Sequence, residues 1–112
     1  MGPYRLEVIV FQITFYVPET HLEEVKNSLF AAGAGKIGNY TRCAWQTKGE
    51  GQFCPQSGSN PFLGEIDKIE RVIEYKVELV CSEKYLKKVI AALQASHPYE
   101  QPAYGVFKLF EA

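Results

Sequence analysis

A strict two-residue alternation near the middle of the chain is the feature that most constrains the fold. Charged and apolar positions alternate at Ile73, Glu74, Tyr75, Lys76, Val77, Glu78 and Leu79. Successive side chains of a β-strand point to opposite faces, so this pattern is typical of a strand with one buried and one wet face. We therefore expect this segment to be a strand in a sheet that is covered on one face and exposed to water on the other.

Three further segments are predicted to be strands. Residues 6–17 are almost wholly apolar and rich in β-branched and aromatic side chains, and residues 104–110 form a last strand. Residues 37–45 carry few charges, so we expect both of their faces to be covered. Residues 48–64 hold four glycines and two prolines and predict a long loop, a type of connection that is usually functional or mobile.

Two amphipathic helices complete the pattern. The first is expected to begin at Pro18–Thr20, with Glu19 or Thr20 as its cap, and to stop at Gly33 and Gly35. The second is expected to be capped by Ser82 or Glu83 and to end before Pro98. Their apolar stripes at helical spacing are Leu22, Val25, Leu29 and Ala32, then Leu86, Val89, Ile90 and Leu93.

The resulting order, β-α-β-β-α-β, predicts an α+β protein of the ferredoxin-like type, an antiparallel sheet with two helices on one face. A length of 112 residues suits one domain over residues 1–112. The strands hold more apolar residues than one covered face needs. We therefore expect the chain to form a homo-oligomer through its sheet.

Composition argues against several classes of partner. The net charge is −1, with 12 basic and 13 acidic residues and no basic run, so we expect no nucleic-acid partner. No apolar run is long enough to span a bilayer, so no membrane association is expected. Cys43, Cys54 and Cys81 form no C-x-x-C pair and are expected to be reduced thiols of a cytoplasmic protein.

Two glycine-rich stretches are candidate sites. Gly35 and Lys36 lie in a glycine-rich turn with a lysine, a combination found in phosphate-binding loops. Those loops lead from a strand into a helix, whereas this turn is expected to lead from a helix into a strand, so a helix cap is the alternative. Gly49 and Gly51 would let backbone amides approach a ligand closely, and Phe53 could stack on it. A purely structural loop is the alternative there.

The third candidate is the segment His97–Pro102. His97 and Glu100 could form a pair of ligands for a divalent metal, although a catalytic zinc site needs three protein ligands and His21 is the only other histidine. The alternative is that the prolines fix the entry to the last strand, with His97 and Tyr99 packed or hydrogen-bonded there. We find no nucleophile set and no pair of carboxylates in an evident pocket, so we do not expect an enzyme.

Five segments together resemble a known family. They are Phe15–Glu19, Ala32–Tyr40, Gly49–Phe53, Asn60–Gly64 and His97–Glu100. In this order they resemble the inserted PII-like domain of the NIF-three-like family, the GTP cyclohydrolase 1 type 2 homologues, over residues 13–110. The last segment also resembles the closing segment of CutA proteins, which share the fold.

The resemblance implies a PII/CutA-like fold, a trimer and ligands bound in clefts between subunits. The family's metal-site residues lie outside the insert, so the chain looks like a free-standing insert to which the hydrolase activity does not transfer. A site would combine loop 49–64 with Gly35, Lys36 and the His97–Glu100 segment of a neighbouring subunit. Residues 1–12 precede the usual start of the insert and are expected to form an extended strand or arm.

Two functions follow from this resemblance. The first is a regulatory module that binds a small molecule or a divalent metal and has no catalytic residues of its own. The alternative is a protein-interaction or assembly module that partners a NIF-three-like protein.

Overall fold

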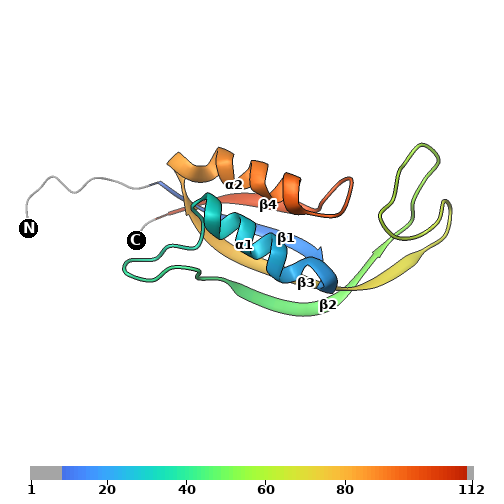
Figure 1. The fold of residues 1–112 in the computed structure, drawn as a ribbon, viewed down its shortest axis with the longest axis horizontal. Coiled ribbons are helices and arrows are strands. Elements are labelled where there is room, and N and C mark those ends of the chain that lie inside the picture. Colours follow the sequence, from blue (N-terminus) through green and yellow to red (C-terminus); the bar gives the residue numbers. More distant parts are fainter. Residues whose placement is uncertain (1–8, 111–112) are drawn as a thin grey trace, which may run out of the picture.

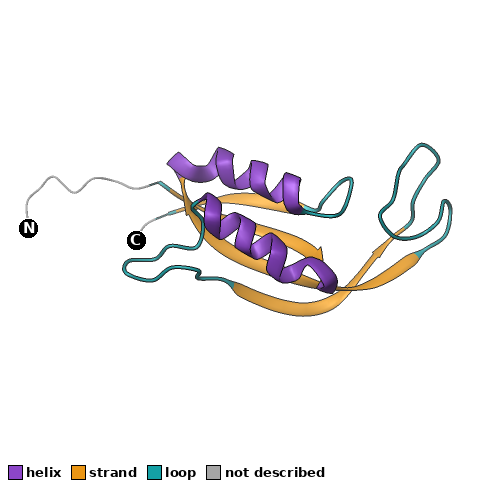
Figure 2. Ribbon diagram, viewed as in Figure 1, coloured by secondary structure: helices purple, strands orange, loops and turns teal. Residues whose placement is uncertain are grey.

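The computed structural model describes residues 9–110 and confirms the predicted fold class. Four antiparallel strands form one sheet in the order β2-β3-β1-β4, and both helices lie side by side on one of its faces (Figure 1, Figure 2). The elements are β1 Val10–Pro18, the short 3-10 helix η1 Glu19–His21, α1 Leu22–Ala32, β2 Trp45–Phe53, β3 Glu70–Ser82, α2 Glu83–Ser96 and β4 Tyr104–Leu109.

The core lies between the sheet and the two helices. Ile13, Phe15 and Val17 are fully buried and share one face of β1, because they stand two residues apart. The apolar side chains that meet them from the neighbouring elements are Val77 and Leu79 of β3, Val25 and Leu29 of α1, and Val89 and Leu93 of α2. The predicted stripes of both helices are therefore the ones that form the core.

The helix ends agree with the sequence in position but not in capping. Neither α1 nor α2 has a side-chain cap hydrogen bond. The Thr20 hydroxyl instead bonds to Nδ1 of His21 at 2.8 Å, and the Glu83 amide donates to the Ile9 carbonyl at 2.9 Å. The predicted cap of α1 by Glu19 or Thr20 is therefore wrong, since His21 occupies that position. Ser82 is the N-cap residue of α2, as predicted, but its side chain makes no capping hydrogen bond. Gly33 does end α1, with a left-handed φ of 120°.

The second strand is the main error of the sequence interpretation. The predicted strand at residues 37–45 is instead a tight turn, in which Ile37 and Tyr40 exchange two backbone hydrogen bonds around Gly38. The strand lies at Trp45–Phe53 and takes in residues 48–53 of the predicted loop 48–64, and the irregular connection is residues 54–69. Because β2 pairs only with β3 and is mostly exposed, it has no buried face to produce an apolar alternation.

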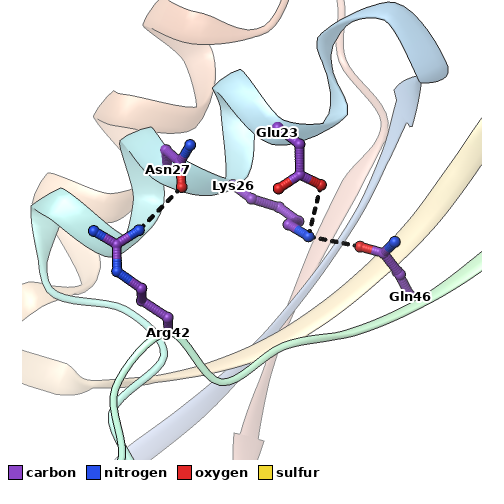
Figure 3. Close-up of polar contacts among 5 residues, drawn as sticks. All are labelled: Glu23, Lys26, Asn27, Arg42 and Gln46. Carbon is purple, nitrogen blue, oxygen red and sulfur yellow. Dashed lines mark hydrogen bonds and ion pairs between the residues drawn. The ribbon is translucent and has the colours of Figure 1, made fainter.

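A polar cluster fastens the start of β2 to α1 (Figure 3). Lys26 Nζ donates to Oε1 of Gln46 at 2.8 Å and pairs with Glu23 at 3.0 Å. Arg42 Nη1 donates to Oδ1 of Asn27 at 3.3 Å. The hairpin of β2 and β3 then continues past the start of α1, where the loop between the two strands curls away from the sheet (Figure 1).

Residues 1–8 lie outside the described residues, so the predicted arm at 1–12 and the strand start at residue 6 fall mostly there. Within the described range, β1 begins at Val10. Among residues 9–110 no helix has the length and apolar character that crossing a bilayer would require.

Candidate functional site

A cleft of about 540 Å³ opens between the far end of the β2–β3 hairpin and the corner that joins α2 to β4. This volume is in the usual range for small-molecule sites. One wall comes from β2 and the loop after it, and the other from β1, β3 and residues 99–103. The lining residues are Tyr16, Glu50, Gly51, Gln52, Phe53, Cys54, Pro55, Gln56, Ser59, Pro61, Phe62, Leu63, Glu74, Tyr99, Glu100, Gln101 and Ala103.

His97 supports the second wall from behind. It follows the last residue of α2 and is only 6% exposed. Its Nε2 lies 2.6 Å from the Tyr16 carbonyl oxygen, and its Nδ1 accepts the Tyr99 amide proton at 3.1 Å. Since the carbonyl can only accept, these partners define the neutral tautomer with the proton on Nε2. Burial lowers the pKa of His97, and this outweighs the opposite effects of the Tyr16 carbonyl and Glu74.

Tyr99 turns its ring into the cleft and its hydroxyl toward β3. The hydroxyl donates to Oε2 of Glu74 at 2.8 Å. Burial raises the pKa of Tyr99 well above its usual value, and the hydrogen bond to Glu74 adds to this, so the phenol stays protonated. Glu74 occupies the space beside Gly51, where any Cβ would collide with its carboxylate. Gly51 therefore allows the close approach of the Glu74 carboxylate, which any larger side chain would displace.

Aromatic rings join the hairpin loop to the body of the protein. Phe53 and Phe62 lie 5.8 Å and 6.4 Å from the Tyr99 ring, centroid to centroid. The rings of His21 and Phe62 are nearly perpendicular, with centroids 5.3 Å apart. The Asn60 amide also donates to Oε1 of Glu100 at 3.1 Å. These contacts hold the loop across from residues 97–103 and so define the cleft.

The structure brings together some of the predicted site residues. Gly51, Phe53, Tyr99 and Glu100 line the cleft, and His97 lies directly behind Tyr99. The loop meets the 97–100 segment of its own chain, whereas the sequence interpretation took that segment from a neighbour.

Three predicted residues lie elsewhere. Gly49 stands in β2 opposite Glu74 but does not line the cleft. Gly35 and Lys36 lie near the other end of the sheet, where the Gly35 amide donates to the Val80 carbonyl and Lys36 lies over the Tyr85 ring. Within one chain Gly35, Lys36 and Gly49 therefore do not belong to the cleft, and a site that combines residues of two subunits stays a prediction.

The metal prediction at His97 and Glu100 also stays a prediction, and the geometry counts against it. A metal needs a free lone pair on an imidazole nitrogen, and His97 uses Nε2 as a donor and Nδ1 as an acceptor within the protein. Among residues 9–110 no three His, Cys, Asp or Glu side chains are grouped to hold an ion.

Sequence reasoning missed several residues of the cleft, above all Glu50, Phe62 and Glu74. Phe62 lies within a segment that carried the family resemblance. Glu74 appeared only as a charged position of an alternating strand. Its role follows from the hairpin register, in which Glu74 stands opposite Gly49 on one side and Pro18 on the other. That register could not be found while β2 was placed at 37–45.

Comparison with solved structures defines the class of fold. CutA from Synechococcus elongatus has a TM-score of 0.64 at 17% identity, covering 92% of this chain and 79% of that one. The Bacillus subtilis GlnK–ATP complex has a TM-score of 0.60 at 12% identity, covering 90% and 82%. The chain therefore has the ferredoxin-like fold of the CutA and PII proteins.

The nearer relationship is to the NIF-three-like proteins, as the sequence motifs predicted. A Bacillus cereus protein related to NIF3 has a TM-score of 0.80 at 37% identity, covering 96% of this chain and 27% of that one. GTP cyclohydrolase 1 type 2 homologues are 44% identical over 100 residues in Halalkalibacterium halodurans and 46% identical over 94 residues in Mycobacterium leprae. These matches cover 89% and 84% of this chain.

The chain spans about a quarter of the length of these relatives, 27% and 24% respectively. No family model matches it. It is therefore a PII/CutA-like module homologous to one segment of the GTP cyclohydrolase 1 type 2 homologues.

Proposed function

We propose that this chain is a regulatory module that binds a small ligand in the cleft between the hairpin loop and residues 97–103. The observation that carries the proposal is the closure of the loop onto the body through Asn60, Glu100 and Phe62. This closure creates a mainly apolar cleft of about 540 Å³ with four aromatic side chains and several polar groups at its walls. Such a combination is what small-molecule sites usually present.

The proposal is for binding rather than catalysis. The groups at the cleft that could transfer protons have partners within the protein: Glu74 and Glu100 each accept a hydrogen bond, and His97 and Tyr99 are bonded as well. Both ring nitrogens of His97 are hydrogen-bonded to backbone groups, and the Tyr99 hydroxyl donates its proton to Glu74. A ligand that touches both walls would instead stabilise the closed loop, which gives the module a means of regulation.

A thermal-shift screen with two matched variants tests the site. Cys54 is exposed and lines the cleft, so Cys54→Trp should fill it, while Ser57→Trp places the same side chain on the same loop outside the lining. Nucleotides, metabolites and divalent metals would be screened on wild type. A ligand at about 100 times its Kd adds about 2.7 kcal/mol of stability, which raises Tm by several degrees.

The expected result is a stabilising compound that works on wild type and Ser57→Trp but not on Cys54→Trp. If no compound raises Tm, the binding proposal fails. If a compound stabilises all three proteins equally, the ligand binds elsewhere and the cleft is not its site.

We also propose that the chain forms a homo-oligomer, most simply a trimer, through the sheet face opposite the helices. Trp45 and Phe107 are 61% and 56% exposed, and the strand register places both on that face with Tyr16 and Leu109. The side chains of Trp45 and Phe107 stand on the opposite edge strands β2 and β4, and exposed large apolar side chains on one sheet face favour association. Light scattering should give a mass above that of one chain for wild type, and Trp45→Glu should lower it. If the wild type is still monomeric at a protein concentration of about 100 µM, where weak association is detected, the proposal is contradicted.

The same surface supports the alternative, an assembly module that partners a NIF-three-like protein. Trp45→Glu would then abolish capture of that protein while leaving the chain monomeric in both forms. The proposal further places the chain in the cytoplasm, because Cys43, Cys54 and Cys81 are free thiols and such thiols persist in a reducing compartment. A disulfide in protein taken from its native cell would contradict that location.

A further inference from the structure

We infer that the cleft selects a small organic cation, a protonated amine or guanidinium carried on a planar or apolar body. This inference rests on the proposed function, because it names the ligand class of the same cleft. Three carboxylates, Glu50, Glu74 and Glu100, belong to its lining, and no Lys or Arg does. The electrostatic character of the walls is thus strongly one-sided.

Two of these carboxylates use a single oxygen for a hydrogen bond within the protein, and the other oxygen of Glu74 lies against Gly51. Glu74 accepts the Tyr99 hydroxyl on Oε2, and Glu100 accepts the Asn60 amide on Oε1. Within residues 9–110 their second oxygens have no hydrogen bond. Because each carboxylate is already oriented by its first partner, the free oxygen is preorganised to accept a charge-assisted hydrogen bond.

Aromatic rings stand beside these carboxylates. Phe53, Phe62 and Tyr99 are grouped with centroid separations of 5.8 Å and 6.4 Å around Tyr99. The faces of aromatic rings attract cations, and they also accept flat apolar groups. The cleft therefore offers a cation both a counter-charge and a surface for the rest of its body.

An anionic ligand such as a nucleotide fits these walls poorly. Three basic side chains of β2 and β3 are each paired with a carboxylate. Lys48 pairs with Glu19 at 3.6 Å, Lys76 with Glu78 at 3.5 Å, and Arg71 lies 3.9 Å from Glu50. A phosphate would meet the carboxylates of Glu74 and Glu100, and of Glu50 beside Arg71, without a basic group in the lining to bind it.

The test compares three ligands of nearly the same shape and different charge, with ATP as a fourth. Benzamidine is cationic, benzamide neutral and benzoate anionic, and each would be titrated into the 112-residue chain by calorimetry and by ¹H–¹⁵N NMR. We expect benzamidine to bind about tenfold more tightly than benzamide, since charged hydrogen bonds exceed neutral ones by about that factor. Benzoate and ATP should not bind in the cleft.

Charge-removal variants localise the effect. Glu74→Gln and Glu100→Gln keep an oxygen acceptor for their internal partners but lose the negative charge, so each should weaken benzamidine about tenfold and leave benzamide unchanged. Glu24→Gln removes the same charge from the exposed face of α1 and should change neither ligand. NMR spectra show whether each variant is folded. If only one of Glu74→Gln and Glu100→Gln folds, that variant alone can be compared with wild type and Glu24→Gln.

Distinct results overturn the inference and the proposed function. Equal affinity for benzamidine and benzamide, or a failure of benzamidine to bind, overturns the cation inference. Shifts of cleft amides by ATP or benzoate overturn it too, while the cleft stands as a ligand site. If neither these four ligands nor any compound of the thermal-shift screen acts at the cleft, both the inference and the proposed function fail.

Discussion

Replacing His97 by Phe should lower the free energy of unfolding by about 3 kcal/mol. Phe keeps a flat ring in a position that is only 6% exposed but removes both nitrogens. The Tyr16 carbonyl and the Tyr99 amide then lose their partner at 2.6 Å and 3.1 Å. A buried polar group without a partner costs about 1–3 kcal/mol, so two such groups at about 1.5 kcal/mol each give the estimate.

Urea unfolding followed by far-ultraviolet circular dichroism measures this change. A domain of this size has a total stability of about 5–15 kcal/mol and an m-value of about 1–3 kcal/mol/M, so the midpoint should fall by about 1–3 M. His21→Phe is the matched control, because His21 hydrogen-bonds only the neighbouring Thr20 hydroxyl among the described residues. It should cost less than about 1 kcal/mol. A His97→Phe protein as stable as the control would refute the structural role of His97.

The same pair of proteins tests the pH dependence. Burial lowers the pKa of His97 from 6.5, so the unfolded chain binds its proton more readily than the folded one. The stability due to neutral His97 is therefore complete above about pH 6.5 and is lost as the pH falls from there through the folded pKa. The slope is at most about 1.4 kcal/mol per pH unit. The stability difference between wild type and His97→Phe should shrink in this window, and a constant difference would show that His97 does not titrate there.

Three further substitutions probe the cleft and the end of α1 by the same urea titration. Gly51→Ala should lower the free energy of unfolding by about 1–2 kcal/mol, because the added Cβ displaces the Glu74 carboxylate. Gly49→Ala, whose Cβ meets open space, should change it by less than about 0.5 kcal/mol. Equal effects of the two substitutions would contradict the packing of Glu74 on Gly51. Tyr99→Phe should cost about 1 kcal/mol through the hydrogen bond to Glu74, and no change would show that solvent replaces it. Gly33→Ala should cost about 2 kcal/mol, because φ is 120° and its Cβ would meet a tyrosine ring of α2; a neutral result would mean that the helix end rearranges freely.

The sequence predicted those elements that bury one face. β3 alternates because its even and odd positions meet different surroundings, and α1 and α2 repeat apolar residues where they meet the sheet. Gly33 ends α1 because its left-handed φ suits glycine. In each of these segments the local pattern and the tertiary packing require the same residues, so the pattern alone was informative.

β2 could not be predicted in this way. Its sequence, from Trp45 to Phe53, is polar and glycine-rich, and nearly all of it is exposed. It becomes a strand because β3 offers it a complete row of hydrogen-bond partners, from Glu78 to Glu70. This is a long-range cause that leaves no periodic signal in the strand itself. The turn at 37–40 was misassigned for the converse reason, since apolar side chains such as Ile37 remain exposed there.

The candidate site was predicted in part for a similar reason. The His97–Glu100 segment stands out by its own residue types, and the structure gives it a defined role beside the cleft. Glu74 and Phe62 become cleft residues only when the hairpin register and the path of loop 54–69 are known. Within this one segment His97 has the structural role that was the alternative, because it is buried and hydrogen-bonded. Tyr99 and Glu100 instead line the cleft, as the binding interpretation expected.

The two walls of the cleft are held with unequal strength, which is what regulation by a ligand requires. The inner wall stands on the paired strands β1 and β3 and on the buried His97, whereas the loop is tied to residues 97–103 by the Asn60–Glu100 hydrogen bond and the Phe62–Tyr99 contact. Breaking these two contacts and the His21–Phe62 contact costs about 3 kcal/mol, so an open loop would be populated at about one per cent or less. A ligand that bridges both walls binds the closed form better and shifts this population by its difference in affinity for the two forms. The position of the loop would then report that the cleft is occupied to any partner that contacts the hairpin.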